Sequence, residues 1–313
     1  MGVPAGGVHG LAPWRAVWNL VKLVQGWGVA CRLGRRERPA ALFATGGYAS
    51  LPVALAARAL RVPVLVYLPD IEPGLAVRVI ARLAACVAVT VEDSRAYFPA
   101  HKVVVTGYPV RAEFHGLDRA GARDSFGLEP EVPALLVLGG SRGARSINQA
   151  LSGVLEQALE LAQVVHVSGE LSWPWVAERR EALPLPLRAR YHAFPYLHDE
   201  MGLALAAADL VLCRAGASTL GELPFFGLPA VLVPYPYAWR YQRVNADWLV
   251  ERGAAVRLDD ERLAAELLPT LRRLLGDRAG LGDMAARMRA LARPDAATRL
   301  AQELHNLAWR GAT

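Results

Sequence analysis

The chain has 313 residues, enough for about two domains of ordinary size. Hydrophobic residues make up 53% of it and charged residues 20%, a balance that excludes a disordered chain or a coiled coil. Lys and Arg outnumber Asp and Glu by 35 to 29, and this basic excess suits a phosphorylated ligand, an anionic membrane surface or nucleic acid without choosing among them.

Cysteine usage and hydropathy limit where the protein acts. Cys31, Cys86 and Cys213 lie far apart, and no Cys or His pair has the spacing of a zinc site. A reducing, cytosolic compartment fits that usage, and the first ten residues lack the pattern of a secretory signal. The uncharged stretches 39–57 and 223–239 are interrupted by Gly and Pro, which a spanning helix does not accommodate. We therefore expect a soluble or peripheral protein.

Short apolar runs alternate with helical patterns in the first part of the chain, which predicts a parallel sheet with helices on both faces. The expected elements, in chain order, are a strand at 40–44, a helix at 51–60, a strand at 62–68, a helix at 76–84, and strands at 86–91 and 102–106. The chain then turns polar, with a short helix over 119–126 and a domain linker over 129–133.

The same alternation restarts after the linker. The expected strands are 134–138, 164–167, 191–194, 210–213, 230–233 and 256–258. The expected helices are 146–161, 201–207, 220–226, 243–252, 261–275, 281–292 and one after Pro294. This pattern predicts an α/β fold of two doubly wound domains, 1–130 and 131–313, which face each other across a ligand-binding cleft. The last helix is expected to pack back on the first domain.

Two glycine-bearing loops follow predicted strands. In the loop at 139–143, the glycines would let the backbone approach an anion at a helix start, and Ser141 adds a hydroxyl. The alternative is a plain tight turn. The loop with Gly46, Gly47 and Tyr48 is read as a simple turn from its residues alone.

A third loop runs over 214–222 and opens a helix. One interpretation is a capping box, in which Glu222 folds back on the backbone; the other is a carboxylate that accepts hydrogen bonds from two adjacent sugar hydroxyls. Gln242 and Asn245, three residues apart on one helical face, either contact a ligand or cap their helix.

Together these loops resemble the MurG-type cell-wall glycosyltransferases, glycosyltransferase family 28. The resemblance is carried by ATGGYASLP (44–52), PGLAVR (73–78), VVTGYPVRAEF (104–114), LGGSRGARSINQ (138–149), HVSGE (166–170), the run 208–236 and RYQRVNA (240–246). It implies the two-domain GT-B fold and inverting transfer of N-acetylglucosamine from UDP-N-acetylglucosamine to lipid I, a polyprenyl-diphosphate-linked muramyl peptide. It implies no cofactor, no metal ion and no nucleic acid partner, but contact with other cell-wall enzymes.

The resemblance also implies site residues. The donor set is Arg111, Ser141, Leu197, Ala217, Ser218, Thr219, Leu220, Gly221, Glu222 and Gln242. In it, the Leu197 backbone would meet the uracil, Glu222 the ribose hydroxyls and Gln242 the N-acetylglucosamine hydroxyls. An uncharged loop of N–H groups would stabilise the leaving diphosphate. On the acceptor side, the loop Gly46, Gly47 and Tyr48 corresponds to a family motif.

The chain departs from the family pattern in two places. The family opens with a strand and a glycine-rich loop that ends in His, and this chain is expected to begin after that unit, through a late start codon, a gene fragment or a split gene. A usual His-Glu-Gln-Asn is replaced over 68–72, where Asp70 and Glu72 are the ionisable groups. Asp70 either takes a proton from a sugar hydroxyl or caps the following turn.

An apolar, aromatic helical face is expected over 11–29, with arginines at 32, 35, 36 and 38 after it. It is either a core helix with a solvated basic loop or a surface that binds the cytoplasmic face of the membrane reversibly. We expect the second, because a membrane-held acceptor must be reached.

Two other functions remain open. A UDP-N-acetylglucosamine epimerase would share the fold but would need acid and base residues around C2. A nucleotide-sugar-binding protein without activity, or a fragment completed by another chain, would share the loops. Incubation with the donor alone, followed by NMR for a C2 epimer, separates epimerase from transferase.

Overall fold

The computed structural model describes residues 13–140, 143–237 and 240–310, and these residues form two compact units. Unit 1 comprises the described residues up to Pro109 together with those from Pro294 onward. Unit 2 is the continuous stretch Val110–Arg293. The chain therefore passes from unit 1 into unit 2 and back again.

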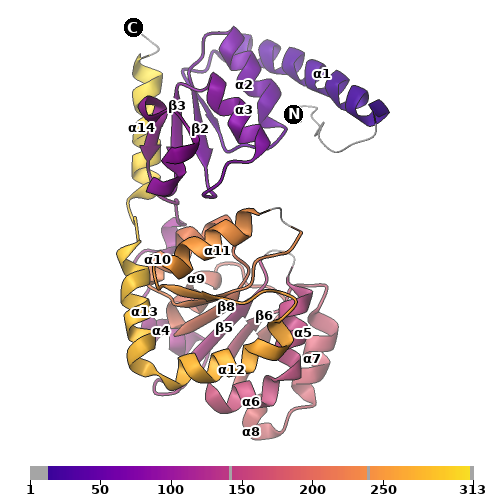
Figure 1. Cartoon of the computed structure of the whole chain (residues 1–313), viewed down its shortest axis with the longest axis vertical. Coiled ribbons are helices and arrows are strands. Elements are labelled where there is room, and N and C mark those ends of the chain that lie inside the picture. Colours follow the sequence, from indigo (N-terminus) through magenta and orange to yellow (C-terminus); the bar gives the residue numbers. More distant parts are fainter. Residues whose placement is uncertain (1–12, 141–142, 238–239, 311–313) are drawn as a thin grey trace. The chain divides into compact units, whose positions relative to one another are not determined.

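Unit 1 is built on a parallel four-stranded sheet in the order β1-β2-β3-β4 (Figure 1). Its strands are β1 (Leu42–Ala44), β2 (Val64–Leu68), β3 (Cys86–Val89) and β4 (Val103–Val105). Its helices are α1 (Pro13–Glu37), α2 (Ser50–Ala59), α3 (Leu75–Leu83), the 3₁₀ helices η1 (Glu92–Tyr97) and η2 (Ala100–Lys102), and α14 (Ala296–Arg310).

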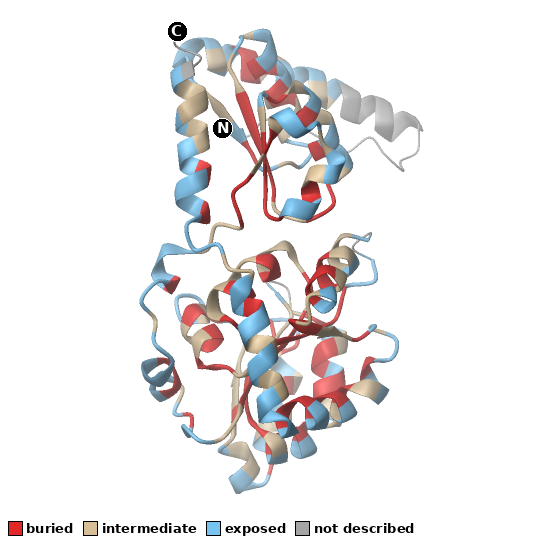
Figure 2. Cartoon of the chain, turned by 60° about the vertical axis from the view of Figure 1, so that its left-hand side comes forward, coloured by how far each residue is buried: buried red, intermediate tan, exposed pale blue. Residues whose placement is uncertain are grey.

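Helices cover both faces of this sheet, which is why all five residues of β2 are buried (Figure 2). On one face, Ala54 of α2 and Ile80 of α3 pack against alternate residues of the strands. On the other face, Leu300 of α14 packs on Leu65 and Tyr67 of β2. Unit 1 thus acquires its second layer from the far end of the chain.

Unit 2 is built on a parallel six-stranded sheet in the order β10-β9-β8-β5-β6-β7. Its strands are β5 (Ala134–Leu138), β6 (Gln163–Val167), β7 (Tyr191–Phe194), β8 (Leu210–Cys213), β9 (Ala230–Leu232) and β10 (Ala255–Arg257). Its helices are η3 (Ala112–Phe114), α4 (Arg119–Ser125), α5 (Arg145–Gly153), α6 (Leu155–Leu161), α7 (Trp173–Glu181), α8 (Leu185–Arg188), α9 (Met201–Ala207), η4 (Ala217–Leu220), α10 (Glu222–Phe226), α11 (Tyr241–Glu251), α12 (Leu263–Gly276) and α13 (Arg278–Ala290).

In unit 2, successive strands are added to the sheet on one side of β5 and then on the other side, beginning with β8. From β5 the chain moves outward to β6 and β7, and from β8 it moves outward to β9 and β10 on the other side. In open parallel sheets, ligands bind outside the carboxyl ends of the strands at such a switch point. This places the loops after β5 and β8 side by side at the carboxyl edge.

Several expected boundaries differ from those in the structure. Residues 110–130, assigned to the first domain from the sequence, pack in unit 2, where α4 lies against α9. The segment 129–133, expected to be a linker, also lies inside unit 2, where Gln163 donates to the Glu129 and Val132 carbonyls at 3.0 and 3.2 Å. The helix expected over 146–161 is two helices, since the backbone at Val154 leaves the helical region (φ −125°, ψ 17°).

Within the described ranges, no helix is both long enough and apolar enough to cross a bilayer.

Candidate functional site

The loop after β5 is packed so closely that glycine is required at two of its positions. A Cβ on Gly139 would lie 2.0 Å from the Ala144 nitrogen. Gly143 has a φ of +74°, and a Cβ there would lie 2.5 Å from the Ser168 carbonyl oxygen at the end of β6. These contacts account for both glycines without a ligand. Ser141, expected to contact the donor, lies outside the described residues.

A fully buried network of polar groups from α5, β6 and β7 lies next to this loop and supports it. Asn148 of α5 donates to the Ser168 carbonyl at 2.7 Å, and its amide oxygen lies 3.0 Å from His166 Nε2. His166 Nδ1 lies 2.6 Å from the Tyr191 hydroxyl. Burial lowers the pKa of His166 to about 3 and raises that of Tyr191, so both side chains are neutral at pH 7. The network ties α5 to the carboxyl end of β6 and to β7.

The loop after β8 forms the short helix η4 and then α10. The Thr219 hydroxyl donates to the Gly216 carbonyl at 2.6 Å, so it stabilises the loop itself. Gly221 is the N-cap of α10 and makes no side-chain cap bond, so the capping box expected as one alternative is not formed there. Leu220 is buried, whereas Ala217 and Ser218 are partly exposed.

Glu222, the first residue of α10, lies in a partly desolvated position. Burial is the largest influence and raises the pKa of its carboxyl, while the charge of Arg111 and a hydrogen bond with Ser218 act in the opposite direction. Arg111 is exposed and lies over the Phe114 ring, with 5.5 Å between guanidinium and centroid. The structure therefore brings Arg111 and Glu222, 111 positions apart in the sequence, close enough for their charges to interact. A carboxylate with a nearby cation can accept hydrogen bonds from hydroxyls.

Gln242 of the expected donor set and Asn245, the other candidate on its helical face, both make structural contacts. Gln242, in the first turn of α11, accepts a hydrogen bond from the Tyr235 backbone at 2.8 Å. Asn245, one turn on, donates to the Ala215 carbonyl at 3.2 Å. Both side chains thus tie α11 to loops at the carboxyl edge. Leu197, in the loop after β7, is buried.

Sequence reasoning missed an ionic cluster that joins three loops of this edge. Arg214, directly after β8, forms an ion pair with Asp260 and donates to the Ser146 hydroxyl at 2.7 Å. Ser146 donates to Asp260 at 2.7 Å. A signal was present, because a cation that directly follows a buried strand needs partners. Its acidic partner lies 46 residues further on, and no local pattern indicates that distance.

The carboxyl edge of unit 1 carries the remaining candidates. Gly46 has a φ of +91°, and a Cβ there would lie 2.7 Å from Val77, so only glycine fits. Gly47 also has a positive φ, and Tyr48 is exposed. The Ser50 hydroxyl donates to the Gly46 carbonyl at 2.6 Å and closes the turn.

Asp70 lies in the segment after β2, which is held in place by its neighbours. Thr90 donates to the Pro69 carbonyl at 2.9 Å and Ser94 to the Ile71 carbonyl at 2.9 Å. Glu72 is buried and paired with Arg78 at 3.2 Å. Asp70 is partly exposed, and the N-cap of α3 is Gly74.

Two parallel α/β sheets, each with ligand-type loops at its carboxyl edge, define the GT-B class of glycosyltransferase fold. Sequence models of the glycosyltransferase family 28 N-terminal and C-terminal domains match residues 2–89 and 134–300. The chain belongs to glycosyltransferase family 28, as the motifs indicated, and is a sugar transferase.

Individual relatives agree with this assignment. A Roseiflexus protein named UDP-N-acetylglucosamine–N-acetylmuramyl-(pentapeptide) pyrophosphoryl-undecaprenol N-acetylglucosamine transferase is 46% identical over 349 aligned residues, which cover 99% of this chain and 79% of the relative. The crystal structure of MurG from Acinetobacter baumannii has a TM-score of 0.73 at 27% identity, covering 92% of this chain and 79% of the other.

The epimerases share the fold with this chain. A UDP-N-acetylglucosamine 2-epimerase from Neisseria meningitidis has a TM-score of 0.64 at 14% identity, covering 95% of this chain and 84% of the other. This likeness concerns the fold alone.

Proposed function

We propose that the chain transfers N-acetylglucosamine from UDP-N-acetylglucosamine to a muramyl peptide carried on a polyprenyl diphosphate, the reaction in the name of its Roseiflexus relative. The observation that supports this most directly is the juxtaposition of Glu222 and Arg111 beside the loop after β8. A carboxylate at the start of a helix can accept hydrogen bonds from two adjacent ribose hydroxyls. The epimerase alternative has no comparable support, since those enzymes resemble this chain only in fold.

The chemistry we propose is a single inverting displacement. The acceptor hydroxyl oxygen attacks C1 of the sugar, the bond from C1 to the diphosphate oxygen breaks, and its electron pair leaves with UDP. The hydroxyl proton passes to the Asp70 carboxylate. Backbone N–H groups at the start of α5 stabilise the negative charge on the departing diphosphate. In this proposal the reaction takes no metal ion and no cofactor.

We further propose that the protein acts at the cytoplasmic face of the membrane and binds it reversibly through α1. The described part of α1 exposes Val21, Val24 and Trp27 at intervals of three residues. Arg32 and Arg35 follow on the same helical face as Val21 and Val24 and are also exposed. An apolar stripe that continues into cations is the pattern of a helix lying in the interface of an anionic bilayer.

The test of the transferase proposal is turnover combined with UDP binding. With UDP-N-acetylglucosamine and a polyprenyl-diphosphate muramyl peptide, the full chain should release UDP and form the disaccharide, detected by mass spectrometry. Glu222→Ala should weaken UDP binding by about tenfold or more in a calorimetric titration, because a charged acceptor is worth about 1.5–3 kcal/mol. Asp70→Asn should lower kcat and leave UDP affinity unchanged.

The matched control is Glu160→Ala, an exposed glutamate on α6, which should change neither quantity. UDP affinity equal in the Glu222 and Glu160 variants would refute the role of Glu222. A C2 epimer formed from the donor alone, without transfer, would refute the proposed reaction.

A further inference from the structure

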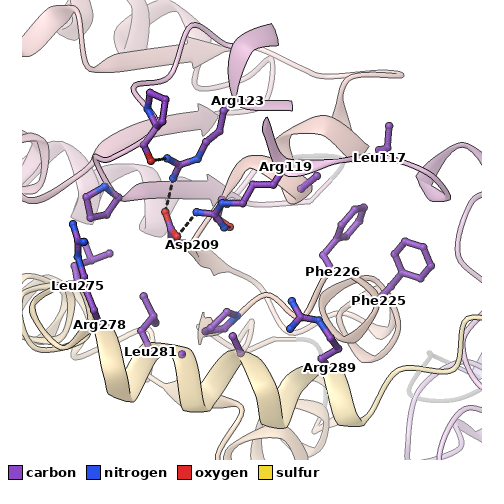
Figure 3. A pocket seen from close by; sticks show the side chains of 18 of the residues that line it. Leu117, Arg119, Arg123, Asp209, Phe225, Phe226, Leu275, Arg278, Leu281 and Arg289 are labelled. Atoms are coloured by element: carbon purple, nitrogen blue, oxygen red, sulfur yellow. Dashed lines mark hydrogen bonds and ion pairs between the residues drawn. The ribbon is translucent and has the colours of Figure 1, made fainter. Parts of the chain in front are cut away.

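A cavity of about 600 Å³ lies at the amino edge of the unit 2 sheet, the edge opposite the loops described above (Figure 3). Pro133, Asp209 and Pro229, which directly precede β5, β8 and β9, line it. Residues of α4, α10 and α13 also line it. Its size is that of a typical small-ligand site. The proposed transfer reaction uses no residue of this edge.

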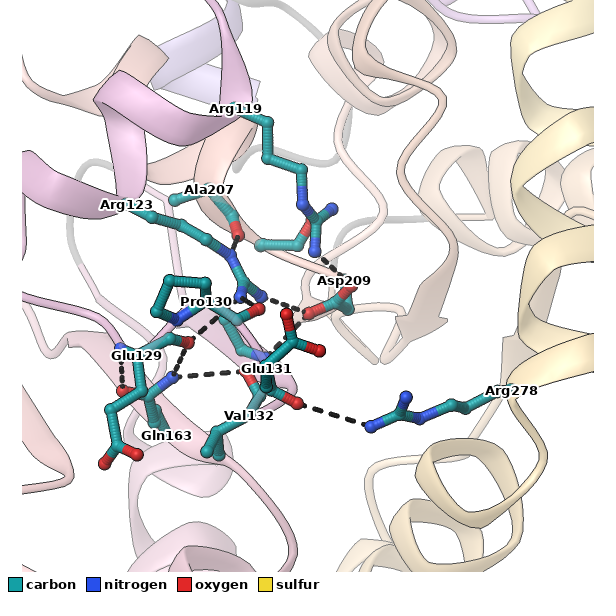
Figure 4. Close-up of polar contacts among 12 residues, drawn as sticks. Arg119, Arg123, Glu129, Pro130, Glu131, Val132, Gln163, Ala207, Asp209 and Arg278 are labelled. Atoms are coloured by element: carbon teal, nitrogen blue, oxygen red, sulfur yellow. Dashed lines mark hydrogen bonds and ion pairs between the residues drawn. The ribbon is translucent and has the colours of Figure 1, made fainter.

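Part of the charge that lines the cavity is compensated within the protein (Figure 4). Arg123 donates to the Ala207 and Glu129 carbonyls at 3.2 and 3.1 Å and pairs with Asp209 at 2.7 Å. Asp209 also pairs with Arg119. With all its donor groups engaged and its side chain 5% exposed, Arg123 has a structural role.

Two further arginines, Arg278 and Arg289, lie on the cavity side of α13 and have fewer hydrogen-bond partners than Arg123. Arg278 donates to the Glu131 carbonyl at 3.3 Å. Arg289 has no acidic partner in the described part of the chain. Between the two arginines, the same helical face carries Gly282 and Ala285, whose small side chains leave room in the cavity. The cavity therefore has cations at both ends of one wall, about 16 Å apart along the helix axis.

Aromatic side chains complete the end of the cavity at which Arg289 lies (Figure 3). Phe225 and Phe226 of α10 are partly exposed, and their centroids are 5.1 Å apart. A cation beside partly exposed rings in a cavity suits a ligand with a planar ring and an anionic group. The small volume favours a ligand of this kind over a protein segment.

The same aromatic residues connect the cavity to the candidate nucleotide site. Phe226 is the last residue of α10, and Glu222 is the first residue of that five-residue helix. Phe114 lines the cavity, contacts Phe226 at 5.4 Å between centroids and lies under the Arg111 guanidinium. A ligand that displaces Phe226 therefore acts on elements that carry both Glu222 and Arg111.

We propose that this amino-edge cavity is a second binding site, for a small organic phosphate with an aromatic ring, held by Arg289 and by the Phe225–Phe226 wall. We propose also that its occupancy changes the affinity of the nucleotide site through the Phe114–Phe226 contact. The second part rests on the proposed function; the first does not.

The test is calorimetric titration of the full chain with 1-naphthyl phosphate, with 1-naphthol and inorganic phosphate as ring-only and charge-only probes. We expect saturable binding of naphthyl phosphate with a Kd below about 1 mM, and weaker binding of the other two. Arg289→Ala should weaken it about tenfold. Gly282→Phe should abolish it, because a side chain there meets nothing within 4 Å and extends into the cavity.

The matched control is Arg272→Ala, an exposed arginine of α12 outside the cavity, which removes the same charge and should leave binding unchanged. If the Arg289 variant fails to fold, the Gly282 variant still tests the site, because a helix accommodates the replacement of a glycine. No saturable binding below about 1 mM, or equal binding by wild type and both cavity variants, would overturn the site.

The coupling is tested by repeating the titration with saturating UDP. We expect the Kd for naphthyl phosphate to change several-fold, and naphthyl phosphate to change the Kd for UDP by the same factor. An unchanged Kd would overturn the coupling. If UDP itself does not bind, the proposed function fails, while the naphthyl phosphate result still decides the site.

Discussion

His166 is an ionisable side chain that the fold keeps uncharged. It is 1% exposed, and both ring nitrogens have hydrogen-bond partners on different elements, Asn148 of α5 and Tyr191 of β7. A proton on this ring would place an uncompensated charge in the interior of unit 2. The residue therefore stabilises the loop edge only in its neutral form.

This predicts a pH dependence of stability. In the unfolded chain His166 takes up a proton near its ordinary pKa of 6.5, but in the folded chain only near pH 3. Between these values the unfolded state binds more protons, so the free energy of unfolding falls as the pH falls, by up to about 1.4 kcal/mol per pH unit. The measurement is urea unfolding between pH 7.5 and 5.5.

The control for that slope is His166→Gln, which keeps a hydrogen-bonding side chain but cannot be protonated. It should be less stable at pH 7.5 and should lose less stability on acidification than wild type. The lowered pKa of His192 adds a contribution of the same sign to both proteins. Parallel slopes for the two proteins would contradict the assignment.

Among the helices, α1 carries the exposed apolar residues on which the proposed membrane binding rests. It packs on α2 through Ala30 and Cys31, while Val24 and Trp27 remain 60% and 42% exposed. An isolated exposed apolar residue needs no explanation, but a stripe that leads into cations does.

For α1 we predict co-sedimentation with anionic vesicles that declines as salt is raised. Arg32→Glu combined with Arg35→Glu should reduce binding more than tenfold, since each cation near an anionic surface contributes about 1 kcal/mol. The control is Arg272→Glu with Arg273→Glu on α12, where both side chains are exposed. Equal partition onto neutral and anionic vesicles would contradict the prediction.

The strands and helices also show what the sequence can and cannot reveal. Strands β5, β7 and β8 begin and end at the predicted residues. For β5 and β8 the reason is that buried parallel strands are unbroken apolar runs, here ALLVL and LVLC. The break between α5 and α6 was missed, although Gly153 marks it, because the apolar spacing continues across it. Helix α7 was also missed, although Pro174 at its start is a signal for a helix beginning.

The sequence singles out the candidate loops where they match a family motif, but it does not predict which distant residues meet there. The loops after β5 and β8 were found from glycine spacing. The Arg214–Asp260 pair and the His166–Asn148 contact join residues 46 and 18 positions apart, and nothing local in the sequence selects those partners. Glu222 was singled out from the sequence as a candidate, whereas the influence of Arg111 on its carboxyl is visible only in the fold.

At the scale of the whole molecule, the two units should unfold separately. Leu300→Ala on α14 removes contacts with Leu65 and Tyr67 and should cost unit 1 about 2–5 kcal/mol. Hydrogen exchange read by mass spectrometry should show lost protection in β2 and β3, with β5 and β8 unchanged. The proposed donor residues lie in unit 2, so UDP affinity should persist.

The control is Gln302→Ala, an exposed residue two positions along the same helix. It should leave exchange in both units unchanged. If the Leu300 variant exchanged faster throughout β5 to β10 as well, the two units would be one cooperative body and the prediction would be wrong.

The return of the chain to unit 1 has a consequence for biosynthesis. β2 and β3 leave the ribosome early, but α14, which covers one face of them, follows only after all of unit 2 has been made. At about 5–20 residues per second, the apolar face around Leu65 stays uncovered for roughly ten seconds or more. Unit 2, being continuous, can complete its fold first. The nascent first unit is therefore the part of the chain that depends most on chaperone protection.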